Sequence, residues 1–161
     1  MVSATGFPDH PAPPVKPIVA AFFCIEPRLA DSRARSIKEA GGGFTICMAG
    51  AAAALLVTED RPAALRQITL AWTVHPFERF LMRVHRYCGY LRIYCAPGGE
   101  LERFDPDNLL DCFTMADMAG EVARAHLLNT VGADRPSDSE VIDIDEQDGQ
   151  PVGLWVPRPP A

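Results

Sequence analysis

His85, Cys88, Cys95 and Cys112 form the one cluster of histidine and cysteine along this 161-residue chain, and both residue types can hold a metal ion. A structural zinc site requires four such donors at the corners of a tetrahedron. The spacing of these four fits no standard pair of zinc ligands. Cys88 and Cys95 also fall on apolar faces of elements expected below. We therefore expect small buried thiols here, with no metal ligand and no cofactor.

Catalytic chemistry has no clear pattern in the sequence either. A nucleophilic cysteine or serine requires a base beside it and a third group that orients the base. His75, His85 and His126 are far apart along the chain, and none has a recognisable local motif. The aspartates between positions 105 and 111 are typical of the first turn of a helix. We expect no catalytic residue and a non-enzymatic protein, with a thiol or zinc enzyme as the third alternative.

A line of arginines is the most organised basic feature. The spacing of Phe77, Phe80, Leu81, Val84 and Cys88 predicts an amphipathic helix from Pro76 to Gly89. On its polar face Arg79, Arg83 and Arg86 follow one another at i, i+4 and i+7.

A hairpin is expected directly after this helix, and it adds to the basic surface. Residues 90–95 alternate as a strand with Arg92 between Tyr90 and Tyr94, and residues 100–104 would return. Guanidinium and aromatic groups are what single-stranded nucleic acid stacks on. Nucleic-acid binding through Arg79, Arg83, Arg86 and Arg92 is thus the second functional alternative, although the net charge of −6 disfavours it.

An acidic segment near the C-terminus supports the leading functional interpretation. Residues 137–146 read Ser-Asp-Ser-Glu-Val-Ile-Asp-Ile-Asp-Glu, with Val141, Ile142, Ile144 and Asp145 in the centre. These ten residues resemble a SUMO-interacting motif, in which a short β-forming run has acidic flanks. The resemblance implies that the segment adds as a strand to the sheet edge of a protein partner.

A local hairpin is the competing interpretation of the same segment. In it, residues 141–145 turn through residues 147–150 and return through residues 152–156. Trp155 would then anchor this end to the domain or contact a partner. The leading hypothesis is an intracellular regulatory protein that binds a protein partner through Val141–Glu146 and Trp155.

Composition favours a reducing compartment and no membrane. Five scattered cysteines form no disulfide pattern, and no apolar run is long enough to cross a bilayer. Charge is uneven: residues 18–104 carry a net +3 and residues 105–161 a net −9. The acidic C-terminal part could therefore occupy the arginine line of its own chain.

The remaining elements follow from periodicity and breakers. We expect strands at residues 18–25, 44–48 and 51–58, and helices at 27–40, 62–72, 109–113 and 114–132. Three glycines at 41–43 end the first of these helices.

Together these elements indicate an α+β fold, with one small domain whose mostly antiparallel sheet packs against about four helices. We expect a flexible proline-rich arm at residues 1–17, the domain at 18–132, and a flexible acidic, then proline-rich, tail at 133–161.

Overall fold

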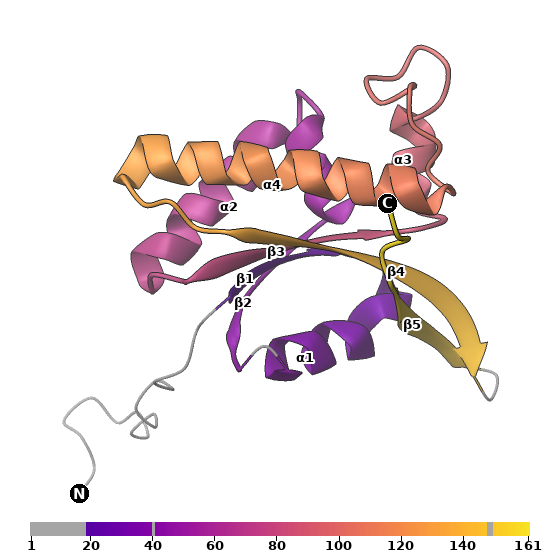
Figure 1. Ribbon diagram of the computed structural model, residues 1–161, viewed down its shortest axis with the longest axis horizontal. Helices are drawn as coiled ribbons and strands as arrows, with labels where there is room; N and C mark the ends of the chain where they lie inside the picture. Colours follow the sequence, from indigo (N-terminus) through magenta and orange to yellow (C-terminus); the bar gives the residue numbers. More distant parts are fainter. Residues whose placement is uncertain (1–18, 40, 148–149) are drawn as a thin grey trace, which may run out of the picture.

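The computed structural model describes residues 19–39, 41–147 and 150–161, and it shows an α/β fold. Five strands form one sheet in the order β2-β1-β3-β4-β5 (Figure 1). All neighbouring strands are parallel except β4 and β5, which are antiparallel. The expected α+β fold with a mostly antiparallel sheet is therefore wrong. Helices that connect successive strands produce the parallel pairing.

The first half of the sheet follows the sequence prediction. Strand β1 (Val19–Cys24) is buried along its whole length, as its uninterrupted apolar run predicts. A short 3₁₀ helix, η1 (Pro27–Leu29), and helix α1 (Ala30–Glu39) lead to β2 (Gly43–Met48). Gly41 and Gly42 have positive φ angles of 86° and 111°, which suit the helix stop expected there.

Residues 79–85 correct the central sequence prediction. They form strand β3 (Arg79–His85), whereas a helix was expected from Pro76 to Gly89. Six of the seven residues are buried, because β3 lies between β1 and β4 with helices on both faces. A strand buried on both faces carries a nearly continuous apolar run, and such a run also satisfies a helical stripe.

Two segments on either side of β3 in the sequence also differ from the prediction, since each forms a helix where a strand was expected. Residues 51–56 form a 3₁₀ helix, η2 (Ala51–Leu56), in place of the expected strand. Helix α3 (Gly89–Tyr94) replaces the first strand of the expected hairpin, and residues 99–103 are turns. Alanine disfavours strands, which accounts for η2.

Two long helices complete the layer on one face of the sheet. Helix α2 (Arg61–Val74) has Pro62 in its first turn and ends at His75. Helix α4 (Leu109–Val131) is a single 23-residue helix where two were expected, and Asn108 caps its first turn by accepting from the Asp111 N–H.

The C-terminal region belongs to the sheet. Strands β4 (Ser137–Gln147) and β5 (Gln150–Val156) pair from Val141↔Val156 to Gln147↔Gln150. The expected flexible C-terminal tail is therefore wrong, and the local hairpin is confirmed. A buried Val141–Ile142 pair at the centre of an acidic segment explains why the segment docks.

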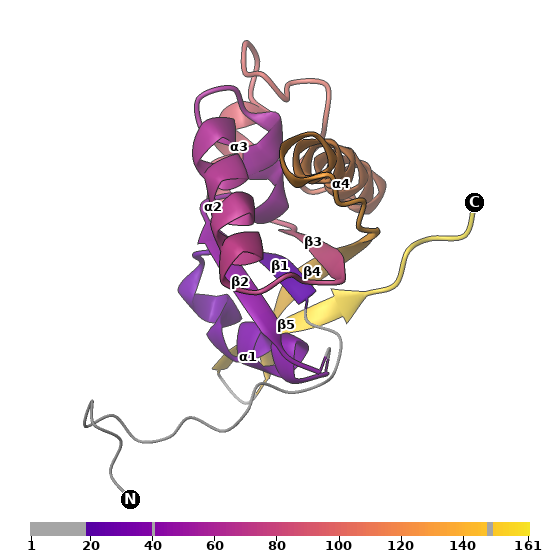
Figure 2. The ribbon, with the colours of Figure 1, turned by 90° about the vertical axis from the view of Figure 1, so that its left-hand side faces the viewer.

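The two faces of the sheet are covered unequally. Helices α2, α3 and α4 lie on one side, while α1 lies on the other beside β5 (Figures 1 and 2). Large side chains that are fully buried, including Phe22, Phe80 and Leu127, form the core between these layers.

Membrane spanning was not expected from the sequence. Among the described residues, no helix combines the length and the hydrophobicity needed to cross a bilayer. The proline-rich arm expected at residues 1–17 lies outside the described residues.

Candidate metal site

Three buried donor side chains converge at the carboxyl ends of two neighbouring strands. Cys24 is the last residue of β1, and His85 is the last residue of β3. Cys88 follows His85 by three residues and caps α3. From β1 the chain moves to β2 on one side and later to β3 on the other, so the sheet order reverses between β1 and β3. Ligands of open α/β sheets bind at such a reversal, outside the carboxyl ends of the strands.

The three donor atoms are close enough to share one ion. Cys24 Sγ, Cys88 Sγ and a ring nitrogen of His85 all lie within 4.8 Å of one another. The residues are 5%, 2% and 2% exposed, respectively. Two thiolates and one neutral imidazole around a divalent cation have no net charge, which suits a site away from water. The set is also one that catalytic zinc uses: three protein ligands, with the fourth position left open.

One hydrogen bond of His85 shows which ring nitrogen carries a proton. Its Nδ1 lies 3.0 Å from the Arg86 carbonyl oxygen. A carbonyl only accepts, so Nδ1 carries the proton and Nε2 keeps its lone pair. Nε2 is buried and makes no hydrogen bond. A backbone carbonyl that holds one ring nitrogen while the other is left for an ion is the usual arrangement of a metal-binding histidine.

Neighbouring groups shift the pKa values of the two thiols in opposite directions. A hydrogen bond from Cys88 lowers the pKa of Cys24, and His85 and the backbone N–H of Glu26 lower it further. The same contact raises the pKa of Cys88, which burial raises as well. The backbone N–H groups of Leu91 and Tyr90 act in the opposite direction on Cys88. One thiolate is therefore favoured in the free site, and a cation is needed to stabilise the second.

The turn between His85 and Cys88 has a strained residue. Tyr87 has a φ angle of 59°, the left-handed region that residues other than glycine rarely occupy. This conformation turns the chain so that side chains three residues apart reach the same point. Backbone strain of this kind persists where the surrounding structure imposes it, commonly at functional sites.

A charged pair lies on the loop that follows Cys24. The Glu26 carboxylate accepts from Arg28 Nε at 2.8 Å and Nη2 at 3.0 Å. The Arg28 side chain is the main cause that lowers the pKa of Glu26 to about 2. Glu26 therefore stays ionised at neutral pH, where it accepts hydrogen bonds. Arg33 holds the same loop by donating to the carbonyls of Cys24 and Glu26 at 3.0 and 3.3 Å.

This donor set differs from the one that the sequence groups together. The structure brings His85 and Cys88 together, as grouped there, and adds Cys24 in place of Cys95 and Cys112. Cys112 donates to the Pro106 carbonyl at 3.4 Å, and burial is the main cause that raises its pKa to about 12. Cys24 could have been noticed as the last residue of a buried strand. Its position suggests a shared site only when β3, which ends in His85, is known to lie next to β1.

The arginines expected as a basic surface are paired within the chain. Arg79 meets Asp138 at 2.8 Å, and Arg83 Nε meets Glu140 at 2.5 Å. Arg86 makes two contacts of 2.5 Å with Asp143. All three acids lie on β4, so the expected occupation of the arginine line by the acidic segment is confirmed.

Arg92 is separate from these three pairs and meets Asp107 at 3.4 Å. Tyr90 donates to Asp60, and Tyr94 donates to Glu59. Nucleic-acid binding stays a prediction that these paired groups do not support.

The residues expected to bind a protein partner lie in the hairpin. Val141 and Ile142 are at most 1% exposed, and Ile144 is partly buried. Asp145 pairs through its backbone with Val152. The side chains of Val141 and Ile142 are therefore not available to a partner while the sheet is folded.

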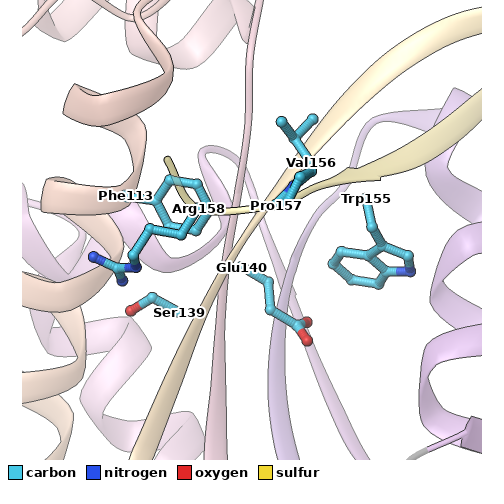
Figure 3. A pocket seen from close by; sticks show the side chains of 7 residues that line it. All are labelled: Phe113, Ser139, Glu140, Trp155, Val156, Pro157 and Arg158. Carbon is cyan, nitrogen blue, oxygen red and sulfur yellow. The ribbon is translucent and has the colours of Figure 1, made fainter. Parts of the chain in front are cut away.

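Trp155 is the exception, since it is 37% exposed. It borders a pocket of about 360 Å³, with Phe113 and Arg158 toward the other end (Figure 3). The Arg83 guanidinium lies 4.4 Å from the Trp155 ring centre and 4.4 Å from the Phe23 ring centre. Trp155 thus docks on the domain and keeps an exposed side, and its contact with a partner stays a prediction.

Neither the models of known protein families nor the curated proteins give a match to this chain.

Proposed function

We propose that this protein is a zinc enzyme that adds water to a small carbonyl-type electrophile, with carbon dioxide as its simplest substrate. The observation that carries the proposal is His85: its buried Nε2 has no hydrogen-bond partner, and a ring nitrogen lies within 4.8 Å of the Cys24 and Cys88 sulfur atoms. This takes up the zinc-enzyme alternative of the sequence analysis.

The donor set supports zinc above harder cations. Thiolate and imidazole are the ligands that zinc prefers, whereas magnesium and calcium prefer oxygen. When bound, zinc would lower the pKa of a water in its open position to near 7 and so supply a nucleophile at neutral pH.

The residues around the donors would do three further things. Burial of Cys24, His85 and Cys88 keeps bulk water away from the donors and favours a small substrate. Glu26, ionised through Arg28, would accept a hydrogen bond from a water near the donors and orient it. Arg33 would keep the Cys24 loop in position through two backbone carbonyls. Carbon dioxide and water would leave as hydrogencarbonate and a proton.

The test combines metal analysis with a hydration assay on the full chain. Purified protein is loaded with zinc and dialysed, its zinc content is measured, and carbon dioxide hydration is followed by stopped flow with a pH indicator. We expect one zinc ion per chain and a rate that rises with zinc content.

Matched variants make the assay specific. Cys24→Ala is expected to lose both zinc and activity. Cys112→Ala, which also removes a buried thiol, is expected to keep both. A chain that binds no zinc would overturn the metal site. A chain that binds zinc and hydrates neither carbon dioxide nor an ester such as 4-nitrophenyl acetate would overturn the enzyme proposal alone.

A further inference from the structure

The two thiols of the candidate metal site are also within reach of each other. Cys24 Sγ and Cys88 Sγ lie within 4.8 Å of each other. A disulfide has a sulfur–sulfur distance of about 2.03–2.05 Å, so bond formation requires a movement of under about 3 Å. Both cysteines are free thiols in this structure.

We propose that in the metal-free chain Cys24 and Cys88 form a peroxide-reactive dithiol that closes to a disulfide. The exclusion of zinc by this disulfide rests on the proposed function, because zinc and the disulfide would use the same two sulfur atoms. The formation of the disulfide in the metal-free chain does not depend on it.

The reaction balances with hydrogen peroxide as the oxidant. The Cys24 thiolate attacks one peroxide oxygen, the O–O bond breaks, and the departing hydroxide takes a proton to give the first water. Cys24 is then a sulfenic acid. The Cys88 sulfur attacks the Cys24 sulfur and displaces its hydroxyl group, which leaves as the second water. In total, two thiols and one peroxide give one disulfide and two waters.

The surroundings assign the two roles. Cys24 is the more exposed of the two, at 5% against 2% for Cys88, so peroxide reaches its sulfur first. Cys88 is the sulfur adjacent to it, which suits the second attack. Both residues are buried, which disfavours oxidants larger than hydrogen peroxide.

The experiment treats the full chain with hydrogen peroxide after chelation, and again after zinc loading. Remaining thiols are then alkylated and the peptides are mapped by mass spectrometry. We expect a Cys24–Cys88 disulfide in the metal-free chain, with a mass lower by two hydrogens, that a dithiol reductant reverses. Zinc loading is expected to suppress it.

Variants separate the steps. Cys88→Ser is expected to leave Cys24 as a sulfenic acid that dimedone traps, while Cys112→Ser still forms the disulfide. Oxidation confined to other cysteines, such as the exposed Cys47, would overturn the inference.

The two proposals fail in different ways. A disulfide that forms in a chain unable to bind zinc would leave this inference standing and remove the proposed function. A chain that binds zinc and forms no disulfide after chelation would overturn this inference and leave the proposed function standing.

Discussion

Strand β3 carries two groups of polar side chains, and they differ in the groups that they face. Arg79, Arg83 and the adjoining Arg86 each meet an acid on β4, although the buried Nη1 of Arg83 has no hydrogen-bond partner. His85 lies between Arg83 and Arg86 in the sequence. Its buried Nε2 has no hydrogen-bond partner, and its ring lies next to two thiols. The arginines stabilise the pairing of two strands, whereas the histidine and thiols have a geometry that an external cation would complete.

The comparison predicts opposite results for substitutions two residues apart. Replacing His85 should change metal binding and leave the metal-free fold intact. Replacing Arg83 should lower the stability of the fold and leave the metal donors in place.

His85→Leu is expected to have the largest effect on zinc. Outer-shell changes reduce metal affinity by about 10- to 100-fold, and loss of a direct ligand should exceed that range. The metal-free variant should unfold close to the midpoint of the metal-free native chain, because loss of an unpartnered buried nitrogen offsets loss of the hydrogen bond to the Arg86 carbonyl. Competition with a chelator gives the affinity, and thermal unfolding gives the stability. Unchanged zinc affinity would remove His85 from the site.

Arg83→Met is expected to destabilise the fold by about 1–3 kcal/mol, since it removes the buried partner of Glu140. The Arg83 side chain is 4% exposed and the Glu140 side chain 35%, so water reaches Glu140 in part and offsets some of the loss. Adding Glu140→Leu should recover most of the loss, and urea unfolding measures both variants. A single substitution that costs under about 1 kcal/mol would show that β4 docks through its apolar residues alone.

Lowering the pH tests the charged pair beside the metal donors. The folded-state pKa of Glu26 is about 2, below the ordinary value of 4.5. Its contribution to stability is therefore present above about pH 4.5 and is lost as the pH falls toward 2. Unfolding midpoints measured across this range should converge for the native chain and Glu26→Gln at the acidic end. Equal differences at every pH would show that Glu26 is not held ionised by Arg28.

Arg79→Ala should have the smallest effect, at most about 1 kcal/mol, because its pair with Asp138 lies in solvent. The Arg79 and Asp138 side chains are 41% and 53% exposed, respectively. Urea unfolding of Arg79→Ala and Arg83→Met compares an exposed and a buried arginine of the same strand. Equal losses of unfolding free energy in the two variants would show that burial does not determine the contribution of each pair.

Local signals predicted the first part of the fold well. The apolar run of β1, the helix that follows it and the glycine stop before β2 depend on neighbours in sequence. The expected helix at Pro76–Gly89 failed because β3 is buried on both faces. Its apolar residues satisfy a helical stripe as well as a central strand, and the partner strand that decides lies at residues 137–147.

The same error concealed the candidate site. On a helix, Cys88 belongs to an apolar stripe, and His85 points elsewhere. On a strand followed by a strained turn at Tyr87, both residues point to the end of β1 and meet Cys24. The pairing of arginines with the acidic segment was predictable because charge is visible in the sequence without knowledge of the backbone.

Zinc K-edge X-ray absorption on the zinc-loaded chain tests the central claim most directly. We predict two sulfur ligands at about 2.3 Å, with one imidazole nitrogen and one further light atom at about 2.0–2.2 Å. Cys24→Ala should lose at least one of the two sulfur scatterers. A first shell of nitrogen and oxygen alone would contradict a site made by Cys24, His85 and Cys88.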